Sequence, residues 1–157
     1  MDVSILQKVK IQAQVLVPLV KALQAELGED KANDLVRRAL SDLYRAFGEQ
    51  WWKSIEGNTL SEKVAVGFTT YQAEKSLVYN VVKHSDDEVR VNVTGCRFAE
   101  FYKAIGTPEL GFLLTCSSDF PMAEGFGSNV EFTRTQTIMQ GASHCDFHYR
   151  LRPDGAA

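Results

Sequence analysis

Arg134 and Cys145 lie among apolar residues in the C-terminal part of the sequence. Residues 130–151 alternate in character, as expected of two strands joined by a short connection that contains a glycine. The apolar residues in line with the two side chains are Val130, Phe132, Phe147, Tyr149 and Leu151. A guanidinium on an apolar face is costly unless an anion meets it, so this stretch predicts a binding site.

Two further groups nearby have chemistry to offer. Cys116 ends a predicted helix and opens a polar loop, and Asp119 follows it by three residues. Thiolates are nucleophiles, and carboxylates transfer protons. Each residue type also has a structural interpretation, because free cysteines are commonly inert core residues and turn aspartates bond their own backbone. Arg134 could likewise form a buried ion pair with a glutamate such as Glu100.

Helical spacing of apolar residues dominates the N-terminal half of the chain. The predicted helices run over residues 4–27, 29–53 and 59–71. Pro18 should kink the first helix or split it after Val17. Trp51 and Trp52 are adjacent on the second helix, so we expect one in the core and the other at a pocket rim or a partner surface.

The pattern changes from helical spacing to alternation near Ser76. The later elements are a hairpin over 76–93, short helices over 97–105 and 108–116, a loop over 117–129 and the two strands of 130–151. Helices and strands in separate blocks predict an α+β fold, with an N-terminal helical layer packed on a mostly antiparallel sheet of about four strands. We expect a single domain over 1–157, made of a mainly helical part at 1–75, a strand–helix–strand part at 76–152 and a frayed tail at 153–157.

Composition argues against several classes of protein. The 157 residues carry a net charge of −3 without a basic block, so nucleic acid is not an expected partner. No apolar run predicts a membrane span, and no signal peptide is apparent. An odd number of cysteines, at 96, 116 and 145, predicts free thiols in a reducing cytoplasm.

Several short stretches, taken together and in order, resemble one family. They are GCRFAEFY at 95–102, GTPELG at 106–111, CSSD at 116–119, FTRTQT at 132–137, and Gly141 with CDF at 145–147. Over residues 25–152 they resemble the L-2-amino-thiazoline-4-carboxylic acid hydrolase family. The resemblance implies a small cytoplasmic hydrolase that acts on a five-membered ring with an amidine- or thiourea-like carbon.

The resemblance also implies roles for the candidate residues. In an aminothiazoline- or thiohydantoin-type ring, the carbon bonded to nitrogen and sulfur is electrophilic, so Cys116 or Cys145 could attack it and a C–N or C–S bond would break. Asp119 would move the proton, and Arg134 would hold the substrate's carboxylate with two hydrogen bonds. The helix C-terminus beside Cys116 is negative and should raise the pKa of that thiol. The aromatic residues expected to contact the ring are Tyr102, Phe132 and Phe147.

Two alternatives stay open. Cys96, Cys116 and Cys145 could converge on zinc with water as a fourth ligand, although no CxxC or HxxxH spacing supports a metal and no other cofactor is expected. The non-enzyme alternative is a module that holds a small acid without turnover, because the arrangement is also similar to small-ligand-binding domains related to vesicle-tethering and 4-vinyl-reductase proteins. The expected partner is a small molecule in either case, and association of identical subunits is left open.

Overall fold

The computed structural model of the chain describes residues 3–153, so the predicted tail lies outside the described residues from position 154 onward. The helices are α1 (Ile5–Leu27), α2 (Glu29–Ser54), α3 (Leu60–Ala73), α4 (Arg97–Ala104), α5 (Pro108–Leu114) and α6 (Asp119–Glu124). The strands are β1 (Leu77–Ser85), β2 (Glu88–Cys96), β3 (Val130–Thr133) and β4 (Cys145–Leu151). Single 3-10 turns, η1 (Cys116–Ser118) and η2 (Ile138–Gln140), complete the chain.

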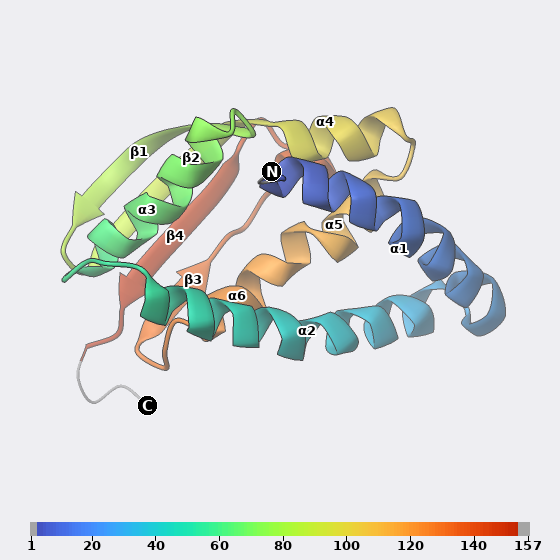
Figure 1. Cartoon of the computed structure of the whole chain (residues 1–157), viewed down its shortest axis with the longest axis horizontal. Helices are drawn as coiled ribbons and strands as arrows, with labels where there is room; N and C mark the ends of the chain where they lie inside the picture. Colours follow the sequence, from blue (N-terminus) through green and yellow to red (C-terminus); the bar gives the residue numbers. More distant parts are fainter. Residues whose placement is uncertain (1–2, 154–157) are drawn as a thin grey trace.

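The four strands form one antiparallel sheet in the order β1-β2-β4-β3. Helix α3 lies across this sheet, whereas α1 and α2 extend away from it and meet near Gly28, with α5 between them (Figure 1). The α+β prediction is therefore confirmed, including the helical layer and the number of strands. Each described helix is too short or too polar to cross a lipid bilayer.

Local signals explain how the helical layer begins. The Thr59 hydroxyl accepts the Glu62 N–H, and the Glu62 carboxylate accepts the Thr59 N–H, which makes a capping box at the start of α3. Helix α1 continues through Pro18, so of the two predicted effects the split after Val17 does not occur, and the kink stays a prediction. Pro18 is exposed, while apolar residues on both sides of it pack against α5 and keep the helix continuous.

The core divides along the same lines as the layers. The sheet and α3 share one cluster, built from Leu60, Val64 and Phe68 of α3 with Val89, Val91 and Val93 of β2. A second cluster joins α1 to α4, and a third joins α1 and α2 to α5. This packing fixes α5 and its C-terminal end relative to the sheet, which matters for the site.

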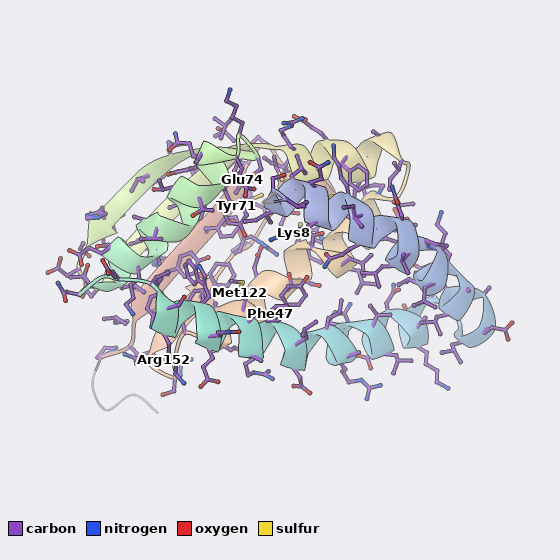
Figure 2. The ribbon with its side chains drawn as sticks, viewed as in Figure 1. Lys8, Phe47, Tyr71, Glu74, Met122 and Arg152 are labelled. Carbon is purple, nitrogen blue, oxygen red and sulfur yellow. The ribbon has the colours of Figure 1, made fainter. Side chains whose placement is uncertain are left out.

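The predicted loop over 117–129 is wrong in its first half, where α6 forms. This short helix lies on α2 with very close backbone contact (Figure 2). A Cβ atom added to Gly48 would lie 2.0 Å from the carbonyl oxygen of Met122, and one added to Gly125 would lie 2.2 Å from the carbonyl oxygen of Arg45. Two glycines thus allow α6 to form where the turn residues alone predict a loop.

The connection between the last two strands is also longer than predicted. Strand β3 ends at Thr133, so Arg134 lies beyond it, and the segment 134–144 with η2 leads to β4. The carboxylate of Asp146 accepts the N–H groups of Thr135 and Gln136, both at 2.9 Å, and holds the chain away from the sheet there. The strand alternation therefore placed Arg134 correctly toward the interior but on the wrong element.

Trp51 and Trp52 do not divide into core and rim as expected, because both are half-buried against the sheet cluster. Their rings lie 5.4 and 4.6 Å from the ring of Phe126, which the two share. Trp52 also lines a pocket of about 200 Å³, where the Lys63 ammonium lies 4.8 Å from its ring. The expectation for Trp52 agrees with this pocket, whereas Trp51 is less buried than predicted.

Candidate functional site

Arg134 and Asp119 form an ion pair in the interior of the molecule. The Arg134 side chain is only 2% exposed, and its Nη1 donates to Asp119 Oδ2. Its Nη2 donates to the backbone carbonyl of Cys116 at 3.0 Å. Three of the predicted site residues thus meet directly, and the carboxylate partner of Arg134 is Asp119 and not Glu100.

Aromatic rings surround the guanidinium of Arg134. Its central carbon lies 5.2 Å from the ring centre of Phe120, 5.6 Å from Phe147 and 5.9 Å from Phe112. The ring of Phe132 packs in turn against Phe120 and Phe147. Ring faces attract a cation, so this cage stabilises the buried charge and keeps water from it.

The short segment between α5 and α6 positions Cys116 and Asp119. The hydroxyls of Ser117 and Ser118 donate to the carbonyls of Leu113 and Thr115, both at 2.5 Å, and this continues the helical path of α5. Residues three apart on such a path share one side, so Cys116 and Asp119 point the same way. Both therefore meet Arg134 from the same segment.

Burial raises the pKa of Asp119 from its ordinary value of 3.8 to about 6, even though the charge and hydrogen bond of Arg134 oppose the rise. The side chain keeps 34% of its surface exposed, and Oδ2 is the oxygen that Arg134 engages. A carboxyl group with a pKa near 6 can take up or release a proton near neutral pH. Asp119 thus has the property that a general base requires.

The three cysteines are free thiols. Burial raises the pKa of Cys116 well above its ordinary value, with Asp119 adding to the rise and Arg134 opposing it. Burial also raises the pKa of Cys145 and of Cys96, although each sulfur accepts a backbone N–H, from Ile138 at 3.3 Å and from Ala99 at 3.4 Å. All three thiols are therefore protonated at neutral pH, which does not favour a preformed thiolate.

Tyrosines complete the surroundings of Asp119. Burial is the main cause of the raised pKa values of Tyr44, Tyr71 and Tyr149, and the charge of Asp119 contributes to each. Tyr71 reaches this region from α3 and is labelled in Figure 2. The carboxylate thus lies among neutral weak acids that come from α2, α3 and β4.

A cleft of about 380 Å³ lies on the other side of the same short segment. Its lining residues are Arg37, Leu40, Ser41, Tyr44, Phe112, Leu113, Ser117, Ser118, Phe120, Pro121 and Glu124. Phe112 and Phe120 belong both to this lining and to the cage around Arg134, so the cleft and the ion pair share two rings. The lining residues Ser118 and Phe120 flank Asp119 in the chain, so a molecule in the cleft would lie beside the segment that carries this carboxylate.

Not all of the predicted site residues come together. Tyr102 is 2% exposed and its ring lies against Gly111, so the contact of Tyr102 with a substrate stays a prediction. Cys145 is buried at the start of β4, whereas Cys116 is half-buried. The sheet residues Phe132 and Phe147 do lie at the Arg134 cage.

The residues at hand do not fit a zinc ion. Over residues 3–153 the structure contains no group of three or more His, Cys, Asp or Glu side chains that could hold a metal. The sulfurs of Cys96 and Cys145 are each turned to a backbone N–H.

The fold and the site define a small α+β protein with a carboxylate–arginine pair held between its helical layer and its sheet. A family model described as L-2-amino-thiazoline-4-carboxylic acid hydrolase matches residues 8–149, and the chain belongs to this family. The comparison with curated proteins gave no match.

Among solved structures, the fold is similar to the phenol-responsive sensory domain of the transcription activator PoxR, solved with phenol. The TM-score is 0.53 with 14% sequence identity, and the match covers 87% of this chain and 72% of that chain. At this identity the likeness concerns the fold.

Sequence reasoning missed Arg37, Tyr44, Phe112 and Phe120, which line the cleft. The sequence Ser118-Asp119-Phe120-Pro121 contained a signal for α6, because a serine followed by an acid and a proline is typical of a helix start. Reading this signal would have placed Phe120 on a helix beside Asp119. The positions of Arg37 and Tyr44 depend on how α2 packs on α6, which no local pattern encodes.

Proposed function

We propose that this protein hydrolyses small five-membered cyclic acids with an amidine- or thiourea-like carbon, of the aminothiazoline or thiohydantoin type. The observation that carries the proposal is the Asp119 carboxyl group, whose pKa is raised to about 6 and which is held by Arg134 beside Cys116. Membership of the L-2-amino-thiazoline-4-carboxylic acid hydrolase family supports the class of substrate.

Asp119 acts first as a base and then as an acid. Its carboxylate takes the proton of the attacking group, which adds to the ring carbon between nitrogen and sulfur. The same carboxyl group then returns the proton to the departing ring atom as the C–N or C–S bond breaks. If the attacking group is a thiol, water hydrolyses the resulting thioester-like intermediate and restores the S–H bond.

Cys116 is a better candidate for the attacking thiol than Cys145. It follows from the helical path that Cys116 and Asp119 share one side, and residue Cys116 is half-buried where Cys145 is buried. The Cys145 sulfur is buried and accepts the Ile138 N–H. Arg134 acts through Asp119, because its charge opposes the rise in the carboxyl pKa and keeps the base ionised at neutral pH.

The test is turnover of a panel of cyclic amidines and thiohydantoins, followed by mass spectrometry. Asp119→Asn should lower kcat by about 100-fold or more, because an amide cannot accept the proton. For the wild type, kcat/KM should fall below about pH 6, since protonation of Asp119 removes the base. Cys116→Ser should lose activity, with Cys96→Ser as the matched thiol control.

Two results would contradict this proposal in different ways. If Asp119→Asn turns over the best substrate at the wild-type rate, Asp119 is not the general base. If Cys116→Ser and Cys145→Ser both hydrolyse it at the wild-type rate, neither thiol attacks the substrate and water is the nucleophile.

The second candidate function is a module that binds a small molecule without turning it over. The aromatic cage and the fold shared with a phenol-responsive sensory domain favour it. Saturable binding of a cyclic acid by the wild type, with no product formed over the whole panel, would support this candidate over the hydrolase.

A further inference from the structure

The cleft beside α2 carries a cation whose charge is poorly compensated. Its one acidic lining residue, Glu124, accepts hydrogen bonds from Arg45 Nε at 3.0 Å and Nη2 at 2.7 Å. Arg37 is the cation in the lining, and among residues 3–153 the one carboxylate within 4 Å of it is that of Asp34, at 3.8 Å. That carboxylate lies closer to Arg38, at 3.1 Å. Arg37 is therefore free to meet an anion in the cleft.

The rest of the lining suits a flat organic ring. The apolar lining residues are Leu40, Phe112, Leu113, Phe120 and Pro121. The hydroxyl hydrogens of Ser117 and Ser118 are already donated to backbone carbonyls, so their oxygens can accept from a bound amino group. A volume of about 380 Å³ falls within the usual range for small-molecule sites.

The structure also shows why a second cation is needed. Arg134 is buried and already bonded to Asp119 and to the Cys116 carbonyl, so its fork is not free to hold a substrate carboxylate as the sequence suggested. Arg37 is half-exposed at the mouth of the cleft, where an incoming acid can reach it.

We infer that the cleft binds a small planar carboxylate, with the acid group on Arg37 and the ring against Phe112 and Phe120. Arg37 thus determines specificity for acids over neutral analogues. This inference rests on the proposed function and names how its substrate is recognised. The ring would lie against the aromatic pair that the cleft shares with the cage around Arg134.

The probe is 2-aminothiazole-4-carboxylate, a planar acid that resists hydrolysis because its ring is aromatic, together with its neutral carboxamide. Binding is followed by amide chemical shifts of ¹⁵N-labelled wild type, Arg37→Gln and Arg38→Gln. Arg38 is the matched control, since it is the neighbouring arginine and shares Asp34 but does not line the cleft.

The expected result is that shifts concentrate at Ser41, Ser117 and Phe120 and that Arg37→Gln raises the Kd of the carboxylate about five- to tenfold. Arg38→Gln should bind the acid like the wild type, and the carboxamide should bind all three proteins alike. Equal Kd values for the acid in both variants, or shifts outside the cleft, would overturn the inference.

The measurement separates this inference from the hydrolase proposal because it needs no turnover. Binding at Arg37 without hydrolysis of any related ring would leave the inference standing and remove the proposed function. If the wild type hydrolyses a related ring and Arg37→Gln changes neither the rate nor the KM, the proposed function stands and the inference about Arg37 is wrong.

Discussion

Replacing Arg134 with methionine should lower the free energy of unfolding by about 3 kcal/mol near pH 8. Removing one partner of a buried ion pair costs about 3–5 kcal/mol, because the other charge is left without a partner. The Asp119 side chain keeps 34% of its surface exposed, so water screens part of this cost and the lower end applies. Methionine fills the space of the arginine stem among the aromatic rings, which limits the loss from packing.

The loss should shrink as the pH falls through 6. The pKa of Asp119 is raised to about 6 in the folded protein, so protonation favours folding, and this contribution is lost as the pH rises through 6. Arg134 opposes the rise, so its removal moves the pKa of the Asp119 carboxyl group further up. The difference in free energy of unfolding between variant and wild type is therefore larger at high pH. Near pH 5 the carboxyl group is mostly protonated in both proteins, and the ion pair no longer distinguishes them.

Urea unfolding at pH 8 and pH 5 measures the difference in free energy of unfolding between Arg134→Met and the wild type, provided that the dependence on urea concentration (the m-value) is unchanged. Arg150→Met is the matched control, because Arg150 pairs with Glu131 at 2.7 Å but is 54% exposed, and such surface pairs contribute about 0–1 kcal/mol. The reasoning fails if both variants lose the same stability at pH 8, or if the loss for Arg134→Met is identical at the two pH values.

Two further predictions concern the helices that support the site. Gly48→Ala should lower the free energy of unfolding by about 1–2 kcal/mol despite the better helix propensity of alanine, because the added Cβ would meet the Met122 carbonyl. Thermal unfolding checks this, with Gln50→Ala at an exposed position as the control. A gain in stability for Gly48→Ala would contradict the close contact. Glu74→Ala should lower the free energy of unfolding by about 1 kcal/mol, because the Glu74 carboxylate accepts the Ile5 N–H at 2.9 Å at the start of α1. Thermal unfolding checks this too, and Thr69→Ala at an exposed position is the control, which should show no such loss.

Local patterns predicted much of the fold. The β1–β2 hairpin and the three long helices depend on residues close together in the sequence, and all appear in the structure. The errors arise where distant contacts decide. Helix α6 depends on the close approach that Gly48 permits, and the path of 134–144 depends on the bonds that Asp146 makes.

The candidate site was predictable in its residue types but not in its pairings. A buried arginine among apolar residues required an anion, and the structure supplies Asp119 from a separate helix. The sequence offered Glu100 equally well, because no local pattern ranks one carboxylate against another across different elements. Placing Asp119 requires knowing that η1 continues α5 and turns Cys116 and Asp119 to the same side.

The raised pKa values of the thiols constrain any mechanism at this site. Few thiolates exist at neutral pH, so attack by Cys116 requires that a base take its proton as the bond forms. Attack by water requires the same base. Asp119 is suited to act as this base in both routes, since its pKa of about 6 leaves it mostly ionised at pH 7. The pH dependence of kcat/KM therefore tests the site before the nucleophile is known, and only the serine variants separate the two routes.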